Sequence, residues 1–156
     1  MKKVKLFFFI STICLFSTST TSNQESAQFH IKVNIIETCE IATETIADMD
    51  FGTVVRSTSN IQSTGSLNVS CTNGTAYNIA LNSTGSLKNV SNTSLVIPYK
   101  LYQDAALSKE WGNMSNTSLS QKGTGTTQNI KIWGKIPDTN LPAGQYTDQV
   151  TAVITY

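Results

Sequence analysis

Few side chains in this sequence could do catalytic chemistry, and their spacing does not assemble a catalytic set. His30 is the single histidine among 156 residues. It stands on the polar phase of an alternating segment, which indicates an exposed side chain. Asp48 and Asp50 are close in sequence, but two carboxylates need a cleft and a partner to act as acid and base. We therefore expect no catalytic residue, no metal site, no cofactor and no enzymatic activity.

The first 22 residues have the pattern of a Sec signal peptide. Basic residues near the start precede an apolar run over residues 6–16, and small polar residues follow. The run is about half of the roughly 20 residues that a membrane-spanning helix needs. We expect cleavage between residues 19 and 27, export to the periplasm and then to the cell surface or medium, and no membrane span afterwards.

Removal of this leader changes the charge balance of the chain. Three of the eleven basic residues leave with it, so eight basic (11 − 3) and ten acidic residues remain, and the net charge is −2 (8 − 10). A surface that binds nucleic acid carries clustered basic residues. We therefore expect no nucleic-acid partner.

Export also determines the chemistry of the cysteines. Cys14 leaves with the signal peptide, and Cys39 and Cys71 remain as an even pair. Paired cysteines in an oxidising compartment favour a disulfide. This disulfide would close a loop of about 33 residues and contribute roughly 3–4 kcal/mol in the chain-entropy model.

The elements that would carry these residues are strands. The segment that opens the mature chain alternates apolar and polar residues, with Phe29, Ile31, Val33 and Ile35 on one face. Further strands are expected over residues 66–71, 76–81, 95–102, 129–136 and 146–156. The first two of these are expected to form a hairpin around Asn73 and Gly74. Short strands between polar turns predict an all-β, immunoglobulin-like sandwich.

Three further positions carry specific expectations. Residues 57–65 lack apolar periodicity and are interpreted as a loop or a weak edge. Pro98 favours an edge position or a bulge. Trp111 lies in a long polar loop and is expected to plug the core, with an exposed adhesive role as the alternative, whereas Trp133 lies in a strand and is expected to pack.

The order of several short motifs resembles the spore coat protein U family, whose domain is also that of archaic, Csu-type chaperone–usher pilins. The matching motifs run along nearly the whole mature chain. They are the strand into Cys39, Asp50-Phe51-Gly52, and residues 65–72, 77–81, 99–104, 111–112, 134–136, 143–148 and 153–156.

The resemblance implies an incomplete immunoglobulin-like β-sandwich that is completed by a donor strand. Residues 1–22 would be the signal peptide, residues 23–36 the N-terminal donor-strand extension, and residues 37–156 the pilin domain. The donor strand would present Phe29, Ile31, Val33 and Ile35. The groove edge, where a chaperone docks, would present Val150, Ala152, Ile154 and Tyr156.

The resemblance also implies a function. The chain would be a structural subunit of a surface pilus that is assembled by donor-strand exchange and supports adhesion and biofilm formation. Its partners would be a periplasmic chaperone, an outer-membrane usher and homologous pilin subunits. Three alternatives stay open: the N-terminal strand could pair within its own domain, the protein could be a spore or cell-surface coat protein, or it could be a monomeric secreted carbohydrate-binding or adhesin module.

Overall fold

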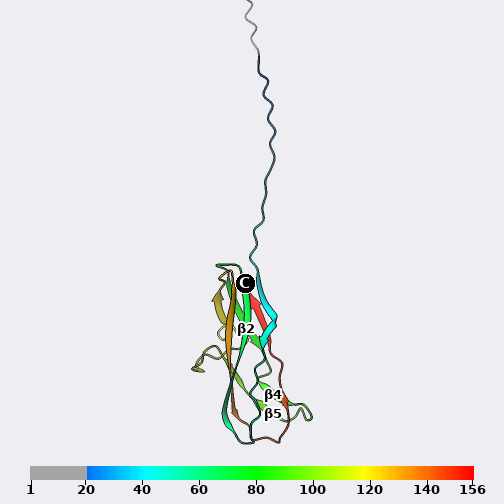
Figure 1. Cartoon of the computed structure of the whole chain (residues 1–156), viewed down its shortest axis with the longest axis vertical. Coiled ribbons are helices and arrows are strands. Elements are labelled where there is room, and N and C mark those ends of the chain that lie inside the picture. Colours follow the sequence, from blue (N-terminus) through cyan, green and yellow to red (C-terminus); the bar gives the residue numbers. More distant parts are fainter. Residues whose placement is uncertain (1–20) are drawn as a thin grey trace, which may run out of the picture. The chain divides into compact units, whose positions relative to one another are not determined.

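The computed structural model describes residues 21–156, apart from the side chains of residues 42–47, and divides the chain into two units. The expected signal peptide lies outside the described residues except for its last two. The first unit ends at Asn34, and its described part, residues 21–34, contains neither helix nor strand. The second unit, Ile35–Tyr156, contains every strand of the described residues (Figure 1).

The second unit consists of antiparallel strands and turns. Among the described residues no helix occurs, and the strands form three sheets with the orders β1-β2-β8-β6, β10-β3-β7 and β5-β4-β9. The bounds are β1 (Cys39–Ala47), β2 (Ser59–Cys71), β3 (Ala76–Asn82), β4 (Ser86–Asn89), β5 (Val96–Pro98), β6 (Lys100–Tyr102), β7 (Leu119–Lys122), β8 (Thr127–Asp138), β9 (Tyr146–Thr147) and β10 (Thr151–Thr155). The all-β class expected from the alternating pattern is confirmed.

The four-stranded sheet is built on the long β2–β8 pair, which extends from Ser59 opposite Asp138 to Ser70 opposite Thr127. The expectation that residues 57–65 form a loop or weak edge is wrong, because β2 is an inner strand. The sequence of the first half of β2 gives little signal of an inner strand, since the inward positions there include Ser63 and Gly65 instead of large apolar residues. Alternation along β2 and β8 gives this sheet one inner face and one outer face.

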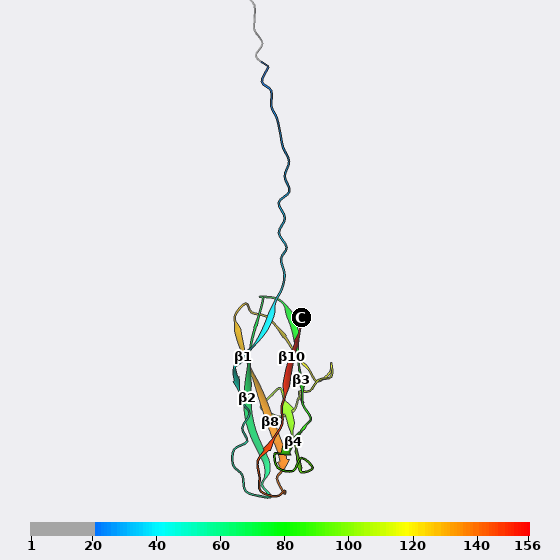
Figure 2. The same cartoon turned by 90° about the vertical axis from the view of Figure 1, so that its right-hand side faces the viewer.

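The core lies between the inner face of the four-stranded sheet and the strands β3, β4 and β10, which lie on the other side in Figure 2, together with β5, the partner of β4. The buried side chains are Leu67, Val69, Cys71, Tyr77, Ile79, Leu81, Ile97, Tyr99, Leu101, Trp111, Ile132 and Ile136. Trp111 is 2% exposed, and its indole N–H donates a hydrogen bond to the Ile79 carbonyl at 2.8 Å. The core-plug role expected for Trp111 is therefore confirmed.

The turn around Asn73 and Gly74 connects the two layers. The expected hairpin is wrong, because β2 pairs with β1 and β8 whereas β3 pairs with β10 and β7. Both strands carry a row of large buried residues, and placing the strands in opposite layers lets the two rows face each other across the core. Gly74 has a φ of 91°, which permits this tight crossing.

Two expected strands are each divided between sheets. The segment 95–102 splits at Tyr99 into β5, an edge strand that contains Pro98, and β6, which pairs with β8. The edge position expected for Pro98 is therefore confirmed. The segment 146–156 splits into β9, which pairs with β4, and β10, which pairs with β3, so the expectation of one continuous last strand is wrong.

Candidate functional site

A cavity of about 930 Å³ lies between the layers of the second unit and is partly open to solvent. One wall is the inner face of the four-stranded sheet, with Ile61, Gly65, Leu67, Ile132 and Ile136. The opposite wall comes from β3, β4, β5 and the C-terminal segment, with Leu81, Leu87, Ile97, Tyr146, Val150 and Ala152. We call this cavity the groove.

The volume of the groove is unusual for a domain core. Protein interiors are close-packed, with few voids larger than a water molecule. At roughly 24 cal/mol per Å³ of cavity, a dry empty void of this volume would cost about 20 kcal/mol, more than the about 5–15 kcal/mol by which a domain is stable. The groove must therefore hold water in the free chain or be filled by apolar side chains from elsewhere.

Residues 48–54 line one side of the groove and close against the four-stranded sheet. Met49 and Phe51 lie over Gly134 of β8, where an added methyl group would come within 2.8 Å of the Phe51 ring and closer still to the Met49 sulfur. The Ser63 hydroxyl, from the strand beside Gly134, donates a hydrogen bond to the Asp50 carbonyl. Glycine is therefore the residue that lets this segment approach the sheet.

The C-terminal strand contributes the opposite edge of the groove. Val150 and Ala152 line the cavity. Ile154 packs against the core opposite Ile79, and Tyr156 follows the end of β10 and is 60% exposed. The structure thus brings two of the four predicted groove-edge residues to the cavity, and their role as a docking edge stays a prediction.

The strand β10 has one open hydrogen-bonding edge. Within the described residues it pairs with β3 alone and ends its sheet. β1 and β10 are in contact and lie side by side in both views, and β1 begins at the end of the unit where β10 finishes (Figures 1 and 2). An open edge next to an apolar groove can accept another strand.

A partly buried hydrogen bond fixes the C-terminal segment between β9 and β10. The Tyr99 hydroxyl donates to the Asp148 carboxylate at 2.7 Å, and the Thr84 backbone N–H donates to the same oxygen at 3.2 Å. Burial, followed by the bond to Asp148, raises the pKa of Tyr99. Both side chains line the groove, so this hydrogen bond holds its wall in place.

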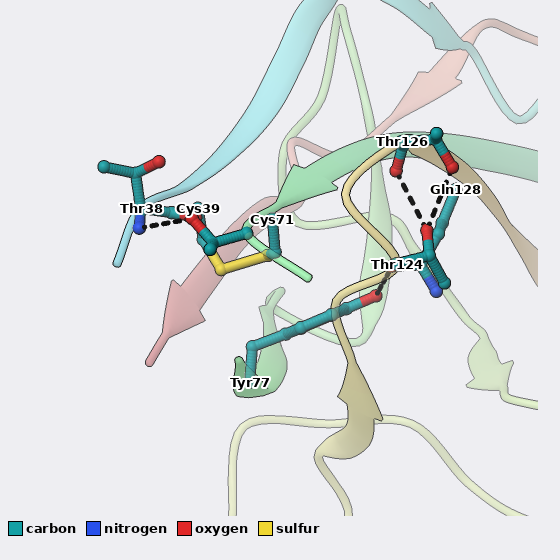
Figure 3. The surroundings of a disulfide bond; sticks show 8 residues. Thr38, Cys39, Cys71, Tyr77, Thr124, Thr126 and Gln128 are labelled. Carbon is teal, nitrogen blue, oxygen red and sulfur yellow. Dashed lines mark hydrogen bonds between the residues drawn. A yellow bond between two sulfur atoms is a disulfide. The ribbon is translucent and has the colours of Figure 1, made fainter. Parts of the chain in front are cut away.

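The disulfide lies at one end of the unit. Cys39 and Cys71 are joined in the structure and are cross-strand partners of β1 and β2 (Figure 3). Thr72 strengthens the same junction, because its backbone N–H donates to the Thr38 carbonyl at 2.9 Å. Below the disulfide in the figure, the Tyr77 hydroxyl donates to Gln128 at 3.2 Å. The disulfide therefore anchors β1 to the four-stranded sheet.

We expect the double substitution of Cys39→Ala and Cys71→Ala to lower the free energy of unfolding by about 3–4 kcal/mol. The unfolded chain regains the conformational entropy that a cross-link between residues 32 positions apart had removed. Urea unfolding monitored by circular dichroism measures the change. Reduction of the wild-type chain is the matched control and should produce the same loss. An unchanged urea midpoint in both samples would contradict a stabilising role for the disulfide.

The N-terminal extension displays its apolar face to solvent. Phe29, Ile31, Val33 and Ile35 are between 81% and 86% exposed. Four large apolar side chains in a row are costly to leave in water. Their predicted role as a donor strand is not tested by this exposure, but the exposure shows that their burial is still available to a partner.

Asp50, one of the two acidic candidates from the sequence, takes part in a local turn. The Asp50 carboxylate accepts a hydrogen bond from the Gly52 backbone N–H at 2.8 Å, which is a local turn interaction. No cluster of three or more potential metal ligands occurs among the described residues. Nor does that part of the chain contain a helix of the length and hydropathy needed to cross a membrane.

Sequence reasoning missed the groove residues other than Val150 and Ala152. The Asp50-Phe51-Gly52 motif was a visible signal, but its sequence alone did not show that Phe51 packs over Gly134. The Tyr99–Asp148 hydrogen bond joins residues 49 positions apart and had no local signal.

Comparison with known proteins gives concordant results. The model of a family described as Spore Coat Protein U domain matches residues 25–153. Protein U of Myxococcus xanthus is 34% identical over 107 residues, which cover 60% of this chain and 59% of that protein. The crystal structure of the CsuC–CsuE chaperone–tip adhesion subunit pre-assembly complex from archaic chaperone–usher Csu pili of Acinetobacter baumannii is also similar. That match has a TM-score of 0.57 and 21% identity over 78% of this chain and 40% of the other. The fold is thus that of an immunoglobulin-like all-β domain.

Proposed function

Because the chain belongs to the Spore Coat Protein U domain family, we propose that it is a structural subunit of a surface pilus and that its subunits join by donor-strand exchange. One observation carries the proposal: a partly open groove of about 930 Å³ lies in the core of a chain whose extension presents four exposed apolar side chains on one face. A strand from a second copy would fill the groove and pair with the open edge of β10.

The energetic gain of this exchange would be large. Burying Phe29, Ile31, Val33 and Ile35 at about 1.5–3 kcal/mol each gives roughly 6–12 kcal/mol before entropy costs. The donor main chain would add hydrogen bonds to an edge that otherwise invites uncontrolled pairing. Both the extension and the groove therefore gain from the same contact.

Chain connectivity favours donation to another copy over insertion into the subunit's own groove. β1 runs antiparallel to β10, and only residues 36–38 separate Ile35 from Cys39 at the start of β1. A donor strand antiparallel to β10 would run away from the start of β1, so Ile35 would lie about 20 Å down the groove from Phe29. The four residue steps from Ile35 back to Cys39 span at most about 14 Å, which is too short to cover that distance. Antiparallel pairing is the more stable arrangement per residue, and a second copy can supply it in full.

The proposed partners are those implied by the resemblance to chaperone–usher pilins. Before assembly, a periplasmic chaperone would fill the groove with a strand of its own, and an outer-membrane usher would exchange that strand for the extension of the next subunit. We place the protein in the periplasm during assembly and on the cell surface afterwards, with adhesion and biofilm formation as the outcome and no enzymatic role. A coat layer built by the same strand exchange is the second candidate, favoured by the description of the family as a spore coat domain.

Deletion of residues 23–36 from the mature chain tests the proposal. We expect the truncated domain to unfold at a much lower urea concentration or to aggregate, and a synthetic peptide of residues 23–36 to restore a monomeric, stable complex. The same peptide with Val33→Asp is the matched control and should fail to restore stability. A truncated domain that is monomeric and fully stable without peptide would refute donor-strand exchange.

A further inference from the structure

The outer face of the four-stranded sheet carries an aromatic pair that points away from the core. Trp133 on β8 lies directly opposite Tyr102 on β6 and Thr64 on β2. Leu101 precedes Tyr102, Gly134 follows Trp133, and both are buried on the inner side. Alternation along the strands therefore places both rings on the outer face. Trp133, which the sequence predicted to pack, is half-buried, as is Tyr102, so each residue keeps part of its surface accessible. Opposed residues have Cβ atoms about 4.5–5.5 Å apart, so the two rings form one aromatic strip.

Three lysines surround this strip on the same face. Lys131 and Lys135 flank Trp133 along β8, and Lys135 lies directly opposite Lys100 of β6. Like charges in opposed positions destabilise a sheet. Glu110 relieves one of them, because its carboxylate accepts a hydrogen bond from the Lys100 ammonium at 2.8 Å and raises the pKa of that lysine. The charges of Lys131 and Lys135 keep the face cationic.

Neutral polar side chains extend the face across β2. Gln62 lies opposite Lys135, and Ser66 lies opposite Lys131. One step further along the strands, Asn129 donates a hydrogen bond to Asn68 at 2.8 Å. The aromatic strip is therefore bordered by ammonium groups along β8 and by amide and hydroxyl groups along β2.

We propose that this surface binds an anionic polysaccharide, and we call it the Trp133 face, defined by Thr64, Lys100, Tyr102, Lys131, Trp133 and Lys135. A sugar ring can lay its C–H face on an indole ring, and its hydroxyl groups can exchange hydrogen bonds with Thr64 and Gln62. The carboxylates of a polyuronate complement Lys131 and Lys135, and they reduce the repulsion between Lys135 and Lys100. An extended polymer also matches the open face of a sheet.

The small number of cations and the neutral polar groups of the face favour this occupant over a nucleic acid. Stacked bases could also use the aromatic strip, but a phosphate backbone requires a longer track of cations. The net charge of the mature chain is −2, and the Trp133 face presents three lysines, one of them paired with Glu110. The hydroxyl groups of a polyuronate can also bond to the neutral polar side chains along β2, such as Gln62 opposite Lys135, so it uses more of this face than a phosphodiester chain does.

The Trp133 face is separate from the groove, since the two lie on opposite sides of the same sheet. The proposal therefore does not rest on donor-strand exchange. If the subunits do form a fibre, each would repeat the face, and a weak site would gain avidity along a long polymer.

Affinity electrophoresis of the mature chain in native gels that contain polygalacturonate tests the proposal, with fractions of equal oligomeric mass compared at low salt. We expect the wild-type chain to be retarded, and Trp133→Ala to weaken the apparent affinity by at least about tenfold. Lys131→Gln combined with Lys135→Gln should weaken it roughly five- to tenfold. Added salt should weaken binding of the wild-type chain, and neutral dextran should cause no retardation.

Lys88→Gln combined with Lys122→Gln is the matched control, because it removes the same charge from exposed positions on β4 and β7. This control should bind like the wild-type chain, and thermal unfolding checks that every variant is folded. Equal weakening by the control pair would overturn the proposal, since net charge alone would then explain binding. The proposal would also be overturned if the wild-type chain were not retarded, or if it bound single-stranded DNA more tightly than polygalacturonate. The same holds if the variants changed self-association and not retardation in the gel.

Discussion

Val33→Asp is expected to abolish polymers of the mature chain while leaving the subunit folded. Val33 is 84% exposed in the free chain, so a carboxylate there stays hydrated and costs the monomer nothing. In the polymer the same carboxylate would be buried in an apolar groove without a partner, at a cost of several kcal/mol. A penalty of about 4 kcal/mol lowers the affinity of the donor strand about a thousandfold. Size-exclusion chromatography with light scattering and negative-stain electron microscopy measure the loss.

Asn34→Asp is the matched control for this change. It adds the same charge one position away, on the polar phase of the extension, and should polymerise like the wild-type chain. The Val33→Asp subunit should still accept a synthetic peptide of residues 23–36, because its groove is unchanged. Polymers of Val33→Asp equal in length to those of the wild type would show that this face of the extension is not the donor.

The parts of the fold that sequence predicted are those with strong local patterns. Tyr77, Ile79 and Leu81 alternate with small or polar residues, and this segment is the strand β3 with all three side chains buried. The pairing of Cys39 with Cys71 followed from their number and from export, and the structure contains that disulfide. In each case, composition or a period of two residues carried the signal.

The parts that sequence did not predict depend on partners that are remote in the chain. Residues 57–65 carry little apolar pattern, and their strand exists because β8 pairs with it along its whole length. The crossing at Gly74 was read as a hairpin, since turn residues do not encode whether the next strand joins the same sheet. Trp133 was expected to pack, and the sequence placed it in the phase opposite Ile132 and Gly134, but its half-buried position on the outer face of β8 depends on which of the two phases meets the core.

The residues of the groove also divide into those that the sequence predicted and those that it did not. The apolar edge at Val150 and Ala152 was expected from the resemblance to the spore coat protein U family, and both residues line the cavity. Its far side was not anticipated, because the close approach of Phe51 to Gly134 joins residues 83 positions apart by shape alone. A glycine in a strand is an ambiguous signal. Only the three-dimensional structure identifies the segment that packs where a side chain would otherwise lie.

Ala152→Glu is expected to block the groove without affecting the donor strand. Ala152 lies opposite Leu81 and lines the cavity. Because the groove is partly open to solvent, a carboxylate at this position can stay hydrated in the free subunit, but an inserted donor strand would bury it against apolar side chains at a cost of several kcal/mol. The matched control is Val153→Glu, since Val153 is the next residue on the opposite phase of β10 and is 42% exposed. The control should polymerise, whereas Ala152→Glu alone should not.

Mixing the two blocked subunits tests most strongly whether the extension of one subunit enters the groove of another. Val33→Asp removes the donor and keeps the groove, whereas Ala152→Glu keeps the donor and removes the groove, so equimolar refolding of the two should yield heterodimers and no longer species. Multi-angle light scattering gives the mass, and a tag on one subunit identifies the pair. Insertion of the donor strand into the subunit's own groove predicts monomers in the mixture, and association through any other surface predicts that the single variants still polymerise. A heterodimer that forms only in the mixture requires one donor and one groove per junction.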